Sequence, residues 1–203
     1  MGKIVLMRHG TVDHCWRNTF LGATDVGLSG EGRALVARIA QRIPLGAFSQ
    51  ILCSDLLRSR QTAESIADVL GIGFVVERRF REIDMGKWDG KRRSEVKRAY
   101  PAEYRRRGHN LWHYRCSGSK ESFALVASRA GYAIQDYLKN NENYLIITHA
   151  GVMRSLMCLY SGKALRAVMR YPCGYGEMLL LTQDEFGAIH YDKYTDGGLV
   201  DES

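Results

Sequence analysis

Two short stretches of this chain follow one pattern, and each contains a histidine. Residues 4–10 and 145–151 each have a short apolar run, then one polar residue, a histidine and a glycine-containing turn. An apolar run of this length, bounded by turn residues and followed by helix-like sequence, predicts a buried strand of a parallel sheet. Ligands of such sheets bind just beyond the carboxyl ends of the strands. We therefore predict that His9 and His149 face one pocket, although they lie far apart in the sequence.

Three charged residues lie close to predicted strand ends. Arg8 precedes His9, Arg58 lies at the start of a helix that follows a strand, and Glu82 follows a third strand. Taken one at a time, each has an ordinary explanation, because helix arginines are usually solvated and an acid beside many bases pairs with them. Arg58 and Arg60 are two positions apart and cannot share a helix face, so at most one of them points to the pocket.

The rest of the chain alternates between predicted strands and helices. We expect strands at 4–7, 50–53, 74–76, 144–148, 177–182 and 188–191, and helices at 30–43, 56–70, 122–140 and from 152 onward. This order predicts a single domain over residues 1–203, a three-layer α/β/α sandwich whose sheet is largely parallel with a mixed edge. Residues 81–119 break the alternation because they are polar, basic and aromatic. We expect a mostly helical insertion there, covering the sheet edge.

Composition narrows the class of protein. The chain has 203 residues, and no apolar run approaches the roughly 20 residues needed to span a bilayer. The apolar run near the N-terminus is too short for a signal peptide, so we expect a cytoplasmic protein without a membrane partner. The five cysteines are odd in number, scattered and without a C-x-x-C pair, which argues against both a disulfide framework and a zinc site: Cys15, Cys53, Cys116, Cys158 and Cys173.

Four motifs occur in the order and spacing of a known family. They are Arg8-His9-Gly10, the stretch 54–63 with Arg58, the stretch 82–90 that begins with Glu82, and Thr148-His149-Ala150-Gly151. Together with smaller matches at 22–29 and 100–103, they resemble the histidine phosphatase superfamily, the group of phosphoglycerate mutase-like phosphatases. The resemblance extends from Lys3 to Arg154.

The resemblance implies phosphomonoester hydrolysis through a phosphohistidine, with neither a cofactor nor a metal ion. His9 would be the nucleophile, Glu82 would protonate the leaving alkoxide, and the equatorial oxygens would be held by His149, Arg8 and Arg58. Elementary chemistry agrees, since guanidinium groups suit phosphate oxygens and can supply the positive charge that a metal ion often provides. The arginines would also disfavour the cationic form of His9 and keep it ready to attack. His149, next to bound phosphate, would tend to stay charged.

The chain departs from the family pattern just after the first motif. Cys15 stands where the family usually has an asparagine, so the phosphate either loses one amide donor or receives it from Asn18 in a shifted loop. We count both residues as candidate substrate-binding residues, together with Leu21, Gly22 and Ala150.

Hydrolysis is favoured over the mutase reaction, in which a bound phosphoglycerate takes the phosphoryl group. The chain is shorter than the mutases of this family usually are, and its opening motif departs from theirs. Residues 20–25 are similar to those of α-ribazole-phosphate phosphatases and their broad-specificity relatives. We expect a small phosphorylated metabolite as the substrate, with mutase-type transfer as the alternative.

The positive charge is concentrated in the insertion. Residues 87–107 carry nine Lys/Arg and three Asp/Glu, a net +6 of the +7 of the whole chain. They either grip the far end of the substrate or form solvated helix faces. The first alternative would use Lys87, Arg92, Arg93 and Arg107 with Trp88 and Tyr100. A non-enzymatic protein that binds RNA or another polyanion ranks lower, because it leaves the four motifs unexplained, and no nucleic-acid partner is expected. A degenerate phosphatase with a regulatory role is a third hypothesis, given Cys15. The oligomeric state stays open, with a dimer as one alternative.

Overall fold

The structure is a computed structural model that describes residues 2–161, 165–195 and 198–199. The strands are β1 (Ile4–Arg8), β2 (Gln50–Cys53), β3 (Phe74–Val76), β4 (Tyr144–Thr148), β5 (Met178–Gln183), β6 (Ile189–Thr195) and β7 (Gly198–Leu199). The α-helices are α1 (Gly30–Ala40), α2 (Leu57–Leu70), α3 (Arg93–Ala99), α4 (Pro101–His109), α5 (Phe123–Leu138) and α6 (Ala150–Tyr160). Short 3₁₀ helices are η1 (His14–Trp16), η2 (Arg78–Phe80), η3 (Gly86–Trp88) and η4 (Leu165–Arg170). No helix among these residues is both long and apolar enough to cross a membrane.

The strands form one sheet in the order β3-β2-β4-β1-β5-β6-β7. The first four in this order run parallel, and β5, β6 and β7 add an antiparallel edge. The predicted parallel sheet with a mixed edge is confirmed. Strands β1 and β4 are neighbours, and Arg8 is paired with Thr148 in their register. The two histidines therefore leave the sheet side by side.

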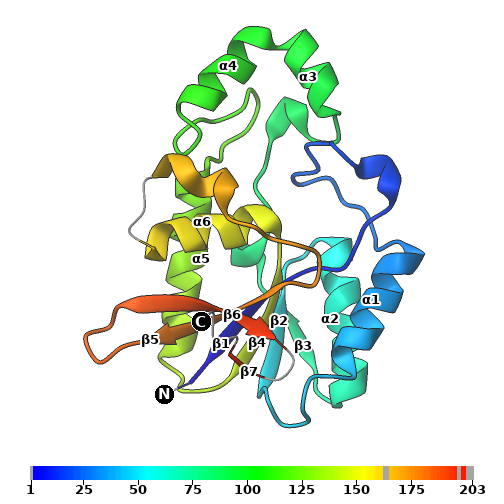
Figure 1. The fold of residues 1–203 in the computed structure, drawn as a ribbon, viewed down its shortest axis with the longest axis vertical. Helices are drawn as coiled ribbons and strands as arrows, with labels where there is room; N and C mark the ends of the chain where they lie inside the picture. Colours follow the sequence, from blue (N-terminus) through cyan, green and yellow to red (C-terminus); the bar gives the residue numbers. More distant parts are fainter. Residues whose placement is uncertain (1, 162–164, 196–197, 200–203) are drawn as a thin grey trace.

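Alternation along the strands divides the core into two halves. Val5 and Met7 of β1 belong to the cluster that packs under α1 and α2, whereas Ile4 and Leu6 belong to the cluster under α5 and α6. The same alternation runs through β2 and β4, because successive side chains of a strand point to opposite faces. Figure 1 shows the two helix pairs on opposite sides of the sheet, which gives the predicted three layers.

The insertion does not lie where the sequence placed it. Figure 1 shows α3 and α4 beyond the end of the sheet, on the side away from the N-terminus, and not along an edge strand. The backbone explains this position, because the insertion pairs with the loop that follows β1. The amide of Phe20 donates to the Lys91 carbonyl at 2.9 Å, and the amide of Gly90 donates to the Phe20 carbonyl at 2.8 Å. The insertion thus stands over the carboxyl ends of the parallel strands.

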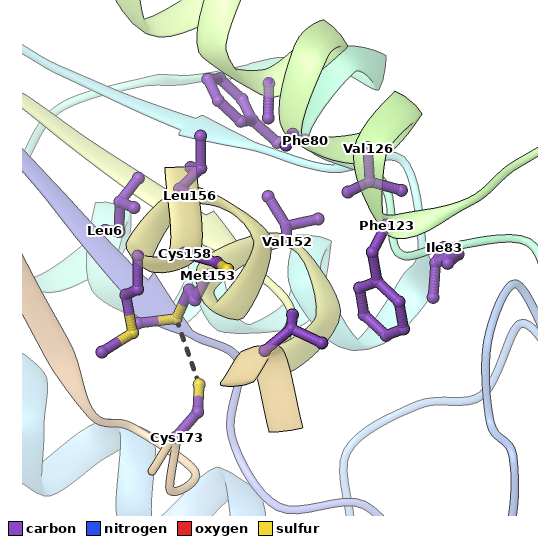
Figure 2. Packing of buried hydrophobic residues seen from close by; sticks show 14 of the residues in the cluster. Leu6, Phe80, Ile83, Phe123, Val126, Val152, Met153, Leu156, Cys158 and Cys173 are labelled. Atoms are coloured by element: carbon purple, nitrogen blue, oxygen red, sulfur yellow. Dashed lines mark hydrogen bonds between the residues drawn. The ribbon is translucent and has the colours of Figure 1, made fainter. Parts of the chain in front are cut away.

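The larger half of the core reaches from the sheet into this insertion. Figure 2 shows part of it, with Phe80 and Phe123 beside α6 and Cys173 below Met153. Trp88 is fully buried and packs against Phe20 at a ring-centroid distance of 5.2 Å. The aromatic residues of the insertion are therefore largely structural, which weighs against stacking on the bases of a bound RNA.

Candidate active site

The two histidines meet at the ends of β1 and β4, as the sequence predicts. The His9 amide donates to the Thr148 carbonyl at 3.0 Å, which carries the strand register one residue beyond β1. The His9 and His149 ring centroids are 5.0 Å apart, and the two residues are 2% and 0% exposed. Strands β1 and β4 pair in parallel, with Arg8 opposite Thr148, and each histidine directly follows its strand. This register brings the two rings together.

The hydrogen bonds of His9 assign its tautomer. Nδ1 lies 2.8 Å from the Gly10 carbonyl oxygen, which can only accept, so Nδ1 carries the proton. Nε2 then holds the lone pair, and the Nε–H of Arg58 donates to it at 3.2 Å. Burial lowers the pKa of His9 well below its ordinary value, and the charges of Arg58 and Arg8 lower it further. The geometry is that of an uncharged imidazole whose Nε2 lone pair points to the Arg58 guanidinium.

His149 is fixed by a hydroxyl group that sequence analysis did not single out. Ser54, which follows β2, places its Oγ 2.5 Å from Nε2 of His149. The other ring nitrogen, Nδ1, is buried and has no hydrogen-bond partner in the described part of the chain. Burial lowers the pKa of His149 well below its ordinary value, with Arg58, His9 and Arg8 acting in the same direction. The sequence analysis expected a charged His149 only when phosphate is bound next to it. That expectation stays a prediction.

Arg58 reaches the site from the first turn of α2. The residue is 1% exposed, and its guanidinium donates to the carbonyl oxygens of Thr24 at 2.7 Å and Gly22 at 2.9 Å. Gly22 has φ +47°, a region that favours glycine, and a side chain there would collide with the Asp89 carboxylate. Arg60 is exposed, so only one of the two helix arginines points to the pocket, as predicted.

Arg8 is held by a second segment that the sequence did not reveal. Its Nη1 donates to the Cys173 carbonyl at 2.5 Å, and its guanidinium carbon lies 3.7 Å from the centroid of the Tyr175 ring. The same ring is 5.6 Å from the ring of His9. No strand, helix or motif pattern in the sequence marked the turn that contains Cys173 and Tyr175, so only the folded chain could identify it.

Glu82 lies where the loop after η2 meets the start of α6. Its carboxylate accepts from the amide of Ile83 at 2.8 Å and from the amide of Gly151 at 3.0 Å. A side chain at Gly151 would collide with this carboxylate. The guanidinium of Arg129 on α5 donates to the carbonyl oxygens of Arg79 at 2.7 Å and Arg81 at 2.6 Å, which fixes the segment before Glu82. Arg129 therefore helps to position Glu82. The sequence analysis did not single it out, because it occurs in an ordinary helix pattern.

The remaining substrate-binding candidates are less closely tied to the histidines. Cys15 and Asn18 are exposed on the loop after β1, and within the described chain no hydrogen bond joins their side chains to the five residues above. Asn18 has φ +61°, and its carbonyl accepts from the Arg93 amide at 2.8 Å, so it anchors the insertion. Leu21 and Ala150 are half-buried next to Gly22 and His149, respectively. Their contact with a substrate stays a prediction.

Two residues of the alternative in which the insertion grips the substrate make other contacts. Trp88 is enclosed in the core, so it cannot stack on a ligand. Arg107 lies over the Phe20 ring, with its guanidinium carbon 5.3 Å from the centroid, and packs within the insertion. Lys87, Arg92 and Arg93 are exposed. The solvated-face alternative therefore describes most of this charge.

A cavity of about 560 Å³ adjoins the site on the side of α1. Tyr175 forms one wall, and the polar lining includes Thr11, Asp13, Arg17 and Glu31. It thus presents both signs of charge beside the loop that follows His9. Among the residues that the structure describes, no group of three or more His, Cys, Asp or Glu side chains is arranged to hold a metal ion.

Comparisons with known proteins identify the family. The model of the histidine phosphatase superfamily (branch 1) matches residues 4–192, and the chain belongs to this family. Phosphoserine phosphatase 1 of Hydrogenobacter thermophilus is 27% identical over 187 residues, which are 91% of this chain and 88% of that protein. Human 6-phosphofructo-2-kinase/fructose-2,6-bisphosphatase 4 is 30% identical over 187 residues, 91% of this chain, but the match spans only 38% of that protein. The solved α-ribazole phosphatase of Shigella flexneri has a TM-score of 0.84 at 17% identity, covering 99% of this chain and 100% of that one.

Proposed function

We propose that this protein hydrolyses a phosphomonoester through a covalent phosphohistidine on Nε2 of His9. One observation carries the proposal: the lone pair of a buried, neutral imidazole lies beside a second histidine and within a hydrogen bond of a buried guanidinium. Phosphoryl transfer requires mainly positioning and charge stabilisation, and this arrangement offers both.

The first half of the reaction transfers the phosphoryl group to the protein. Nε2 of His9 attacks phosphorus as the bond to the ester oxygen breaks, while Arg8, Arg58 and Nδ1 of His149 face the equatorial oxygens. Protonated Glu82 gives its proton to the departing alkoxide. Two backbone amides hold the Glu82 side chain at the start of α6, near His149, and this placement supports its role in proton exchange with the leaving oxygen.

The second half returns the protein to its resting state. A water molecule attacks the phosphohistidine, the nitrogen–phosphorus bond breaks, and Glu82 takes a proton from the attacking water. Inorganic phosphate leaves, and Nε2 regains its lone pair. If a bound phosphoglycerate took the place of water, the same intermediate would give the mutase reaction instead.

The cavity and the relatives support a small phosphorylated metabolite as the substrate. The cavity of about 560 Å³ beside the site has the size of a small metabolite and a polar lining. Relatives bear the names phosphoserine phosphatase 1 and 6-phosphofructo-2-kinase/fructose-2,6-bisphosphatase 4. We therefore expect a small, polar phosphorylated metabolite, and a panel of phosphorylated amino acids, sugars and glycerates will identify it.

The test is turnover of p-nitrophenyl phosphate by the wild type and by His9→Ala. We expect turnover by the wild type, loss of it in His9→Ala, and full activity in the matched control His190→Ala, an exposed histidine paired with Asp184. Brief reaction followed by denaturation in base should trap phosphate on the wild type alone. A wild type without turnover from acidic to neutral pH would remove the proposal, and so would an active His9→Ala.

A further inference from the structure

The turn from Cys173 to Glu177 is built around Arg8. Two backbone hydrogen bonds join them: the Arg8 amide donates to the Glu177 carbonyl at 3.0 Å, and the Gly176 amide donates to the Arg8 carbonyl at 3.1 Å. The turn is closed on itself by the Glu177 amide, which donates to the Gly174 carbonyl at 3.2 Å, and by the Gly174 amide, which donates to the Glu177 carboxylate. The backbone therefore fixes where the side chains of this turn lie relative to Arg8.

The turn is also anchored in the core. The Cys173 side chain is 5% exposed, and its thiol donates to the Met153 sulfur of α6 at 3.5 Å, the contact drawn as a dashed line in Figure 2. On the other side, Gly176 lies so close to Ile39 of α1 that a Cβ there would be 2.6 Å from its Cδ1. Gly176 has φ +75°, which also favours glycine. The turn thus bridges the two helix layers beside the strand ends.

From this position the turn contacts the Arg8 guanidinium in two ways. The Cys173 carbonyl accepts from Nη1, and the guanidinium carbon lies over the Tyr175 ring, 3.7 Å from its centroid. Together these contacts restrict both the direction and the rotation of the guanidinium. The Nε–H of Arg8 is buried and has no partner in the described chain, so the group retains a donor for an anion.

We propose that Tyr175 is a positioning residue of the phosphate site, which orients Arg8 for an equatorial oxygen through ring stacking. The proposal rests on the proposed function, and it assigns to Tyr175 a role that acts through Arg8. The aromatic ring carries the effect, because the cation is attracted to the ring face, whereas the hydroxyl is dispensable.

The experiment is a double-mutant cycle on anion binding and turnover. Tyr175→Phe keeps the ring, Tyr175→Leu removes it, and Tyr132→Leu is the matched control on an exposed tyrosine of α5. The readouts are the inhibition constant of orthovanadate, the kcat and KM for p-nitrophenyl phosphate, and the thermal midpoint. A stacking contact of this kind corresponds to a loss of about 3- to 30-fold. We expect that loss of vanadate affinity and of kcat/KM in Tyr175→Leu, and changes below about twofold in Tyr175→Phe and Tyr132→Leu.

The cycle is completed in an Arg8→Met background. There Tyr175→Leu should change vanadate affinity by less than about twofold, because the residue through which it acts is gone. Equal losses in both backgrounds would overturn the proposal, as would a Tyr175→Leu variant that binds vanadate like the wild type. If the thermal midpoint of Tyr175→Leu falls, Tyr175→Met provides the second ring-free variant.

Failure of the proposed function would look different. A wild type that binds inorganic phosphate but does not turn over substrate would remove the phosphatase proposal, and phosphate affinity measured by calorimetry would still test Tyr175 through the same cycle. A wild type that neither binds phosphate nor turns over substrate would overturn both.

Discussion

Lowering the pH below 7 should weaken the fold through its two buried histidines. His9 and His149 have pKa values well below normal in the folded protein because burial and nearby arginines disfavour their charged forms. In the unfolded chain both titrate with an ordinary pKa near 6.5. Below that pH the unfolded state binds more protons than the folded state, so stability falls as the pH falls.

The size of the effect follows from this linkage. A histidine that stays neutral when folded loses about 1.3 kcal/mol of stability between pH 7 and pH 5.5, and the pair therefore loses about 2.5 kcal/mol. That is a large share of a typical unfolding free energy of about 5–15 kcal/mol. Asp89 acts in the opposite direction, because burial raises its pKa to about 6 and its protonation favours the folded state on acidification.

Urea unfolding at pH 7 and pH 5.5 measures these contributions. His9→Gln and His149→Gln should each reduce the loss between the two pH values by about 1.3 kcal/mol relative to the wild type, and Asp89 cancels from that difference. His113→Gln, at an exposed position, should leave the loss unchanged. If the His9 and His149 variants lost as much stability as the wild type on acidification, both histidines would titrate alike in the folded and unfolded protein, and the lowered pKa values would be refuted.

Four further outcomes test the site and its support. Ser54→Ala should weaken orthovanadate inhibition by about 3- to 10-fold, the value of one neutral hydrogen bond, because Nε2 of His149 loses its partner. Ser54→Thr should restore the inhibition. Equal losses in both variants would assign Ser54 a packing role only. Glu82→Gln should slow alkyl phosphates far more than p-nitrophenyl phosphate, whose leaving group needs little protonation, and equal losses on the two substrates would remove Glu82 from the acid role. Treatment with EDTA should leave turnover intact, because guanidinium groups supply the charge, and strict dependence on added magnesium would contradict that mechanism. Trp88→Ala should reduce the unfolding free energy by about 3–5 kcal/mol, since the indole is fully buried, and a loss below about 1 kcal/mol in urea unfolding would show that the insertion packs independently of it.

The sequence predicted the elements that follow local rules. Strands at 50–53, 74–76 and 144–148 have the predicted bounds, because each is a short apolar run between turn residues. Ser29 caps α1, its hydroxyl accepting from the Gly32 amide at 3.0 Å. The helix expected from 122 to 140 spans Phe123–Leu138, a difference confined to its ends. The meeting of His9 and His149 needed one non-local assumption, namely that their strands are neighbours.

The contacts that the sequence did not predict join residues that are far apart in the chain. Tyr175 lies in the turn before β5, far from Arg8 in the sequence, and the Cys173 acceptor is a backbone carbonyl that any residue could provide. Ser54 lay inside a recognised motif, but its bond to His149 exists only once β2 and β4 pair. The sequence left the role of Trp88 open, because aromatic residues among basic ones look alike whether they bind a ligand or form the core of an insertion.

Arg8 and Arg58 have other kinds of partner than Arg79, Arg81 and Arg129. Outside the site, Arg79, Arg81 and Arg129 form ion pairs with carboxylates. Arg8 and Arg58 have no carboxylate within ion-pair distance in the described chain, and carbonyl oxygens of Cys173, Thr24 and Gly22 hold them instead. A neutral acceptor fixes the direction of a guanidinium without cancelling its charge. With neutral histidines, the positive charge that a phosphate dianion would meet in the proposed site comes from these two arginines, already oriented by backbone carbonyls.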